Sequence, residues 1–210
     1  TIVGSPQYRA MKWMIDVDSY TTIPKRGDIV DDASKRFLVE RYALVVFYFS
    51  NANNNNNNSN GPTTTTTNWN LDNIVSQRRF GRTSHCHWNT NIDLGGGVLI
   101  TETNNEKNVP QGMFCSNNGV DDGDDEDEGV VTELQFANFG LQGQLPWELS
   151  LLQDVRIVDM DKNDLQGTLP LEYFRDWTSI QVFWASQNRL SGTLPSALRR
   201  WTELQSLDLE

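Results

Sequence analysis

Apolar residues recur at a fixed interval along the last part of the chain, from 131 to 210. Three copies of one pattern follow each other, opening 24 and 25 residues apart, and a fourth copy begins before the sequence ends. In each copy an apolar stretch with alternating positions leads, after a polar turn, to Leu, Gly, Leu and Pro. The copies open at Val131, Val155, Ile180 and Leu204. This spacing indicates stacked units that bury their apolar faces against one another.

Each position of the repeat has a structural reason. The alternation at the start of a copy predicts a short strand, and adjacent copies should form a parallel sheet on the concave side of the stack. Asn163 and Asn188 follow their strands and can satisfy backbone groups where the chain turns. The first copy has Phe139 at this position. Either Asn138 replaces the missing Asn through a local slip, or the first copy is an atypical terminal repeat.

The N-x-L-x-G-x-L-P motif resembles the plant-type leucine-rich repeats of receptor-like kinases, receptor-like proteins and polygalacturonase inhibitors, a type also widespread in algae. This resemblance implies an α/β fold: a leucine-rich-repeat solenoid with short parallel strands on its concave face, preceded by a helical N-terminal cap. We therefore expect two parts, a cap over 1–130 and repeats over 131–210. The repeats comprise three complete copies and a truncated fourth.

Helical spacing of apolar residues predicts two helices within the cap. Tyr8, Met11, Met14 and Ile15 indicate a first helix at about 6–16. A second helix is expected at about 33–49, with Asp32 as its N-cap. The apolar residues expected to face inward from the second helix are Phe37, Leu38, Tyr42, Val45, Val46 and Phe49.

Two segments of the cap have compositions that cannot bury apolar surface. A run of Asn that ends at Asn58 and five threonines from Thr63 to Thr67 predict a disordered insertion at about 50–68. Acidic residues crowd 121–128, which we interpret as a solvated loop rather than a weak cation site. The net charge is −11 and the bases form no cluster, so we expect no nucleic-acid partner.

The resemblance also assigns roles to the aromatic and cysteine residues ahead of the first repeat. The order Trp69, Cys86, Trp88 and Cys115 is similar to the W…C-x-W…C arrangement of plant-type caps. It implies that both tryptophans belong to the core of the cap and that Cys86 pairs with Cys115 in a disulfide. Free thiols remain the alternative if the chain is intracellular.

The chain offers little chemistry for catalysis. His85 and His87 flank Cys86 and are the sole histidines, so they raise the alternative of a zinc site. Adjacent residues cannot easily all reach one tetrahedral metal, and known nucleotide-binding, kinase and hydrolase motifs are absent. We therefore expect a binding protein with no cofactor, no metal and no enzymatic activity.

The candidate binding surface is the concave face of the repeats. Side chains that point outward from the predicted strands should form columns across successive copies. Trp184, lying between carboxylates, would act as an apolar anchor, or else its ring would lie flat on neighbouring side chains. The predicted ligand-binding residues are Gln135, Asp159, Trp184 and Asp208 in the central column and Asp161 and Val182 beside it.

These features predict a recognition module that binds a protein or peptide of basic character. The leading interpretation is part of a receptor-like cell-surface protein acting in signal transduction, extracellular and anchored in the membrane only through segments outside this chain. A secreted inhibitor or adhesion protein of the polygalacturonase-inhibitor type is the first alternative. An intracellular, cytoplasmic scaffold is the second.

Overall fold

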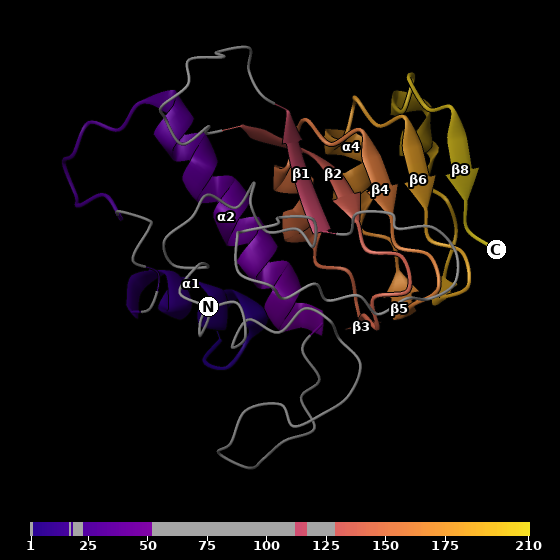
Figure 1. Ribbon diagram of the computed structural model, residues 1–210, viewed down its shortest axis with the longest axis horizontal. Helices are drawn as coiled ribbons and strands as arrows, with labels where there is room; N and C mark the ends of the chain where they lie inside the picture. The colour runs from indigo at the N-terminus through magenta and orange to yellow at the C-terminus, as the bar shows by residue number, and fades with distance from the viewer. Residues whose placement is uncertain (1, 17, 19–22, 52–111, 117–128) are drawn as a thin grey trace, which may run out of the picture.

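The computed structural model describes residues 2–16, 18, 23–51, 112–116 and 129–210 (Figure 1). Within these residues the chain has an α/β fold, in which two helices lie beside a sheet of mainly parallel strands. The predictions for Trp69, Cys86, Trp88 and the two histidines lie outside the described residues, as do those for 52–68 and 121–128.

Helices α1 (Pro6–Asp16) and α2 (Asp32–Asn51) occur where the apolar spacing predicted them. Ala10, Trp13 and Met14 form the buried face of α1, whereas Met11 and Ile15 are exposed, contrary to the pattern used to find the helix. In α2 every residue from Ala43 to Tyr48 is buried. A helix that is apolar on all sides must be covered on all sides, and α2 packs against both α1 and the first repeat.

The ends of α2 differ from the prediction. Asp31, not Asp32, caps the helix, since its carboxylate accepts hydrogen bonds from the backbone N and Oγ of Ser34 at 2.8 and 2.7 Å. The helix also continues through Ser50 and Asn51, which were expected to lie in the insertion. Asn51 is buried, and its Nδ2 donates to the carbonyl oxygen of Phe47 at 2.8 Å.

The main sheet has the order β1-β2-β4-β6-β8. Its four repeat strands are parallel and in register, because equivalent residues of successive copies pair with each other. Strand β1 lies antiparallel to β2 at the edge next to α2 (Figure 1), with an irregularity between Phe114 and Cys115. The strands span Gly112–Ser116 (β1), Val130–Gln135 (β2), Ile157–Asp159 (β4), Val182–Trp184 (β6) and Ser206–Asp208 (β8).

A second parallel sheet, which the sequence did not lead us to expect, follows the turn after each main strand. It consists of β3 (Gln142–Gly143), β5 (Asp164–Thr168) and β7 (Arg189–Ser191). Gly143 has a φ of +92° and lies close to α2, where an added Cβ would be 3.0 Å from the carbonyl oxygen of Ser50. Glycine is therefore required here both for the backbone angle and for the close approach of the helix.

Short helices return each repeat to the start of the next. They begin directly after the repeated prolines, at η2 (Trp147–Leu151), α4 (Leu171–Asp176) and η3 (Ser196–Arg200). Pro suits this place because it fixes φ and its missing N–H is not needed in the first turn.

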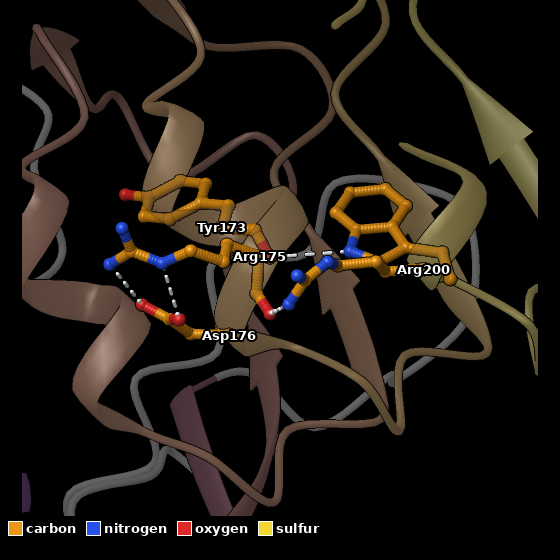
Figure 2. Close-up of polar contacts among 5 residues, drawn as sticks. Tyr173, Arg175, Asp176 and Arg200 are labelled. Atoms are coloured by element: carbon orange, nitrogen blue, oxygen red, sulfur yellow. Dashed lines mark hydrogen bonds and ion pairs between the residues drawn. The ribbon is translucent and has the colours of Figure 1, made fainter. Parts of the chain in front are cut away.

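Aromatic residues join these short helices into a layer. Tyr173 stacks on Trp177 with ring centroids 4.1 Å apart, and Phe174 stacks on Trp201 at 4.7 Å. The indole N–H of Trp201 donates to the carbonyl oxygen of Tyr173 at 3.2 Å (Figure 2). Figure 2 also shows Arg175 pairing with Asp176.

The turn after each main strand has the same geometry in the three repeats, and this decides between the two explanations for the first repeat. Asn138, Lys162 and Gln187 occupy equivalent places and all have positive φ, at 53°, 57° and 54°. The register therefore has not slipped, and Phe139 occupies the Asn position. Phe139 is buried against Phe136, with ring centroids 5.3 Å apart, and Phe136 in turn contacts Phe47 of α2 at 5.4 Å. The atypical residue thus fills space between the first repeat and the helices.

Polar contacts also connect the helices to the first repeat. Glu40 is buried, and one carboxylate oxygen accepts a hydrogen bond from the backbone N of Val131 at 3.2 Å. Its other oxygen accepts from Arg36 Nε at 3.0 Å, and Arg36 also pairs with Asp154. These contacts give the backbone N of Val131 and the charges of Glu40 and Arg36 their partners, without which burial of these groups would cost free energy.

Candidate functional site on the open face of the main sheet

The strand alternation places polar side chains on one face of the main sheet, which we call the open face. Leu134, Val158 and Phe183 point inward and are fully buried. Their neighbours along each strand point outward, and the pairing of Gln135 with Asp159, of Asp159 with Trp184 and of Trp184 with Asp208 makes one continuous column. The strand pairing therefore aligns these four residues in the order that the sequence predicted for the central column.

Asp159 and Asp208 share one local conformation. In each, carboxylate atom Oδ1 accepts a hydrogen bond from the backbone N two residues later, at 3.1 Å from Asp161 and 3.3 Å from Glu210. These bonds orient both side chains and leave Oδ2 of each without a hydrogen bond to any described residue. Two equivalent carboxylates therefore stand on either side of Trp184 with acceptor capacity to spare.

Trp184 is bonded to the next strand and stays partly exposed. Its indole N–H donates to Ser206 Oγ at 2.8 Å, so the ring reaches diagonally across to the next strand. The side chain nevertheless remains 37% exposed. Ser206, which is not among the predicted site residues, fixes the ring. The one sequence clue to this contact is the diagonal position of Ser206, whose partner in the register is Val182.

Other predicted site residues have partners inside the chain. Asp161 Oδ1 accepts a hydrogen bond from the backbone N of Ser186 at 2.7 Å, so this carboxylate joins two repeats. Gln135 Nε2 donates to Glu133 Oε2 at 3.1 Å. Val182 is half-buried on the strand of Trp184. These residues support the open face. The groups available to a ligand are Oδ2 of Asp159, Oδ2 of Asp208 and the exposed ring of Trp184.

The open face is negatively charged, although the charge of the nearby Lys162 partly offsets that of Asp159. Among the described residues, no lysine or arginine forms an ion pair with Glu133, Asp159, Asp161, Asp208 or Glu210. Elsewhere in the repeats the carboxylates of Asp164 and Asp176 do have arginine partners, at 2.7 and 2.9 Å. These described carboxylates of the open face thus lack the arginine partners that Asp164 and Asp176 have.

Burial raises the pKa of Asp159 above its usual value, the hydrogen bond from the backbone N of Asp161 and the charge of Lys162 oppose this rise, and the charge of Asp161 adds to it. A carboxyl whose pKa is higher in the folded chain opposes folding while it is ionised, and this opposition disappears as the pH falls through that pKa. Asp159→Asn should therefore raise the free energy of unfolding by about 0.5 kcal/mol at neutral pH. The gain should vanish in acid, which urea unfolding across a pH series would measure.

A matched control for this prediction is Asp164→Asn, which removes the same charge from the second sheet. Asp164 is paired with Arg189, so its replacement should give no gain at neutral pH. A loss of stability for Asp159→Asn at neutral pH would show that this carboxylate is structural and would contradict our interpretation.

Cys115 in β1 is disulfide-bonded. Its predicted partner, Cys86, lies outside the described residues, so the pairing stays a prediction. Within the described part of the chain, no group of three His, Cys, Asp or Glu side chains is placed to hold a metal. None of the helices described is long and apolar enough to cross a membrane.

Comparisons with known proteins point to one class of relatives. No family model matches the chain. Over 87 residues, 41% of this chain, it is 30% identical to phytosulfokine receptor 1 of Arabidopsis thaliana and spans 8% of that receptor's length. The BIR2 ectodomain from Arabidopsis thaliana aligns with a TM-score of 0.42 and 25% identity, covering 48% of each chain.

A further solved structure gives a similar result. The leucine-rich-repeat ectodomain of the Arabidopsis thaliana receptor kinase SOBIR1 aligns with a TM-score of 0.41 and 21% identity, over 47% of this chain and 52% of that one. The chain thus spans about half the length of these ectodomains. The resemblance to plant-type leucine-rich-repeat proteins, predicted from the repeat motif, is confirmed.

Proposed function

We propose that this chain, which is similar to plant leucine-rich-repeat receptors, is a recognition module that binds a protein or peptide of basic character on its open face. The observation that carries the proposal is the column of Asp159, Trp184 and Asp208, an exposed aromatic ring between two oriented carboxylates. Exposed tryptophan supplies much of the binding energy at many interfaces, and complementary charge speeds encounter.

Electrostatic cost supports this proposal. Burial of Asp159 carries a desolvation penalty, and the charge of the nearby Asp161 repels that of Asp159. Arginine residues pair with Asp164 and Asp176 elsewhere in the same repeats, whereas none pairs with Asp159 or Asp208 among the described residues. A cationic ligand would relieve the repulsion between the carboxylates of Asp159 and Asp161, and this relief would contribute to the free energy of binding.

We further propose that the module belongs to a receptor-like protein at the cell surface, with any membrane anchor in segments other than those described. The disulfide at Cys115 supports an oxidising, extracellular environment, because disulfides rarely persist in the cytosol. Similarity to phytosulfokine receptor 1 supports the receptor role. In this proposal the chain performs no catalysis and contributes contact area to recognition.

The test begins by capturing a partner through a photo-crosslinking amino acid at Ile157, which flanks the column on β4. The same group at Gln166, exposed on the second sheet, identifies non-specific capture. Affinity of the captured partner for the purified chain is then measured by calorimetry. The double variant Asp159→Ala with Trp184→Ala should weaken binding by roughly 10- to 100-fold.

The matched control is Asp164→Ala with Trp147→Ala, which removes the same two residue types from other surfaces. Trp147 is 48% exposed and lies in η2, on the short-helix side of the repeats. This control should bind like the unmodified chain. Unchanged affinity in the open-face variant would refute the proposed surface, and binding that strengthens with added salt would refute the proposed charge.

A further inference from the structure

Resting on the function proposed above, we propose that the open face contains a subsite for one arginine side chain, with Trp184 as a stacking platform and Asp159 as the carboxylate partner. The neighbouring Asp208 completes the subsite from the other strand. Strand pairing places the backbones of Asp159 and Asp208 about 5 Å from the backbone of Trp184, on opposite sides.

The hydrogen bonding of Trp184 limits what its ring can recognise. Since its N–H is already donated to Ser206 Oγ, the indole has no donor left for a ligand. What the ring offers is its exposed aromatic surface, held in place by that same bond. A planar cation is attracted to such a surface through the ring quadrupole, and a guanidinium group can also stack on it.

The carboxylate of Asp159 has the complementary chemistry. Its Oδ1 is oriented by the backbone N of Asp161, and its Oδ2 has no partner among the described residues. Partial burial makes a charge-assisted contact at this carboxylate stronger than at a fully hydrated one. A guanidinium stacked on Trp184 can donate sideways to Asp159, whereas an ammonium group cannot both stack and donate in the plane of the ring.

The experiment uses three short Gly-Ser peptides that differ in one central residue, which is arginine, lysine or citrulline. Citrulline keeps the planar shape of arginine without its charge. Binding to the whole chain is followed by NMR through the indole N–H signal of Trp184, assigned with Trp184→Phe, and through the backbone amide signals of the open face in the variants that lack Trp184. We expect the arginine peptide to bind roughly five- to tenfold more tightly than the lysine peptide, and the citrulline peptide to leave the signal unmoved.

Variants assign the two contacts. Asp159→Asn should weaken binding of the arginine peptide by about tenfold. Trp184→Leu should abolish the preference for arginine over lysine. Ser206→Ala frees the indole and should reduce the same preference without changing the charge. Asp164→Asn and Trp147→Phe are the matched controls and should leave both affinities unchanged.

Two results would overturn the subsite while leaving the proposed function standing. These are equal binding of the arginine and lysine peptides, and arginine binding that survives Trp184→Leu. If neither cationic peptide shifted any open-face signal at millimolar concentration, and the captured partner also ignored the open-face variants, the subsite and the proposed function would both fail. The partner's response therefore separates the two failures.

Discussion

Replacing Asn163 with Ala should lower the free energy of unfolding by about 3 to 5 kcal/mol, because several backbone groups lose their partner together. Asn163 Oδ1 accepts hydrogen bonds from the backbone N atoms of Phe139 and Leu141 at 3.0 and 2.9 Å. Its Nδ2 donates to the carbonyl oxygens of Phe136, Met160 and Asp161 at 2.8 to 3.1 Å. Urea unfolding followed by circular dichroism measures the loss.

Two further variants sharpen this result. Asn163→Asp keeps the acceptor but removes both donors and brings charge towards carbonyl oxygens, so it should be at least as damaging as Ala. Gln166→Ala removes an exposed amide from the adjacent strand β5 and should be nearly neutral. If Asn163→Ala unfolded like Gln166→Ala, the hydrogen-bonding role of the Asn position would be wrong.

Arg41→Met should destabilise the chain by about 3 to 5 kcal/mol, since it leaves the carboxylate of Asp18 buried without its cation. The two side chains are fully buried, and Nε and Nη2 of Arg41 reach the carboxylate oxygens of Asp18 at 2.5 and 2.8 Å. Thermal unfolding of the variant measures the effect.

An exposed ion pair on the neighbouring helix supplies the control. Lys12 and Asp16 are 2.6 Å apart on α1 but both are largely in water, so Lys12→Met should hardly change the melting temperature. Adding Asp18→Leu to Arg41→Met should recover part of the loss, because the unpaired charge is then removed. If Arg41→Met alone did not lower the melting temperature, solvent would have to reach the pair of Arg41 and Asp18.

The sequence predicted the features that depend on local periodicity. Alternation of apolar residues was enough to place the strands and to align Gln135, Asp159, Trp184 and Asp208, since side-chain direction in a strand has a period of two. Asn163 was predicted to satisfy the turn because few side chains can both donate and accept there. Helix α1 followed from the spacing of its apolar residues.

Features that depend on distant contacts were not predictable in this way. Arg41 is in the middle of a buried helix because Asp18, 23 positions earlier in the chain, neutralises it. Met11 and Ile15 share the spacing of buried residues yet remain exposed, since nothing described packs on that side of α1. The second sheet also escaped prediction, because strands of two to five residues carry too little alternation to be recognised.

The same limit applies to the candidate site. Sequence placed Trp184 on the open face but could not decide between an anchor and a ring resting on neighbours. The diagonal hydrogen bond to Ser206 orients the ring, and it joins two residues 22 positions apart through the register of their strands. Asp161 was predicted beside the central column as a ligand-binding residue, yet its carboxylate accepts a hydrogen bond from the backbone N of Ser186 and so connects two repeats.

The repeat asparagines also set a direction for assembly. Asn163 completes the turn that contains Phe139, a residue 24 positions earlier, and Asn188 completes the next turn through Met160 and Leu165. As the chain emerges from the ribosome, each turn must keep its polar groups hydrated until the following repeat has been synthesised. Nascent repeats should therefore become protease-resistant one unit behind the growing end.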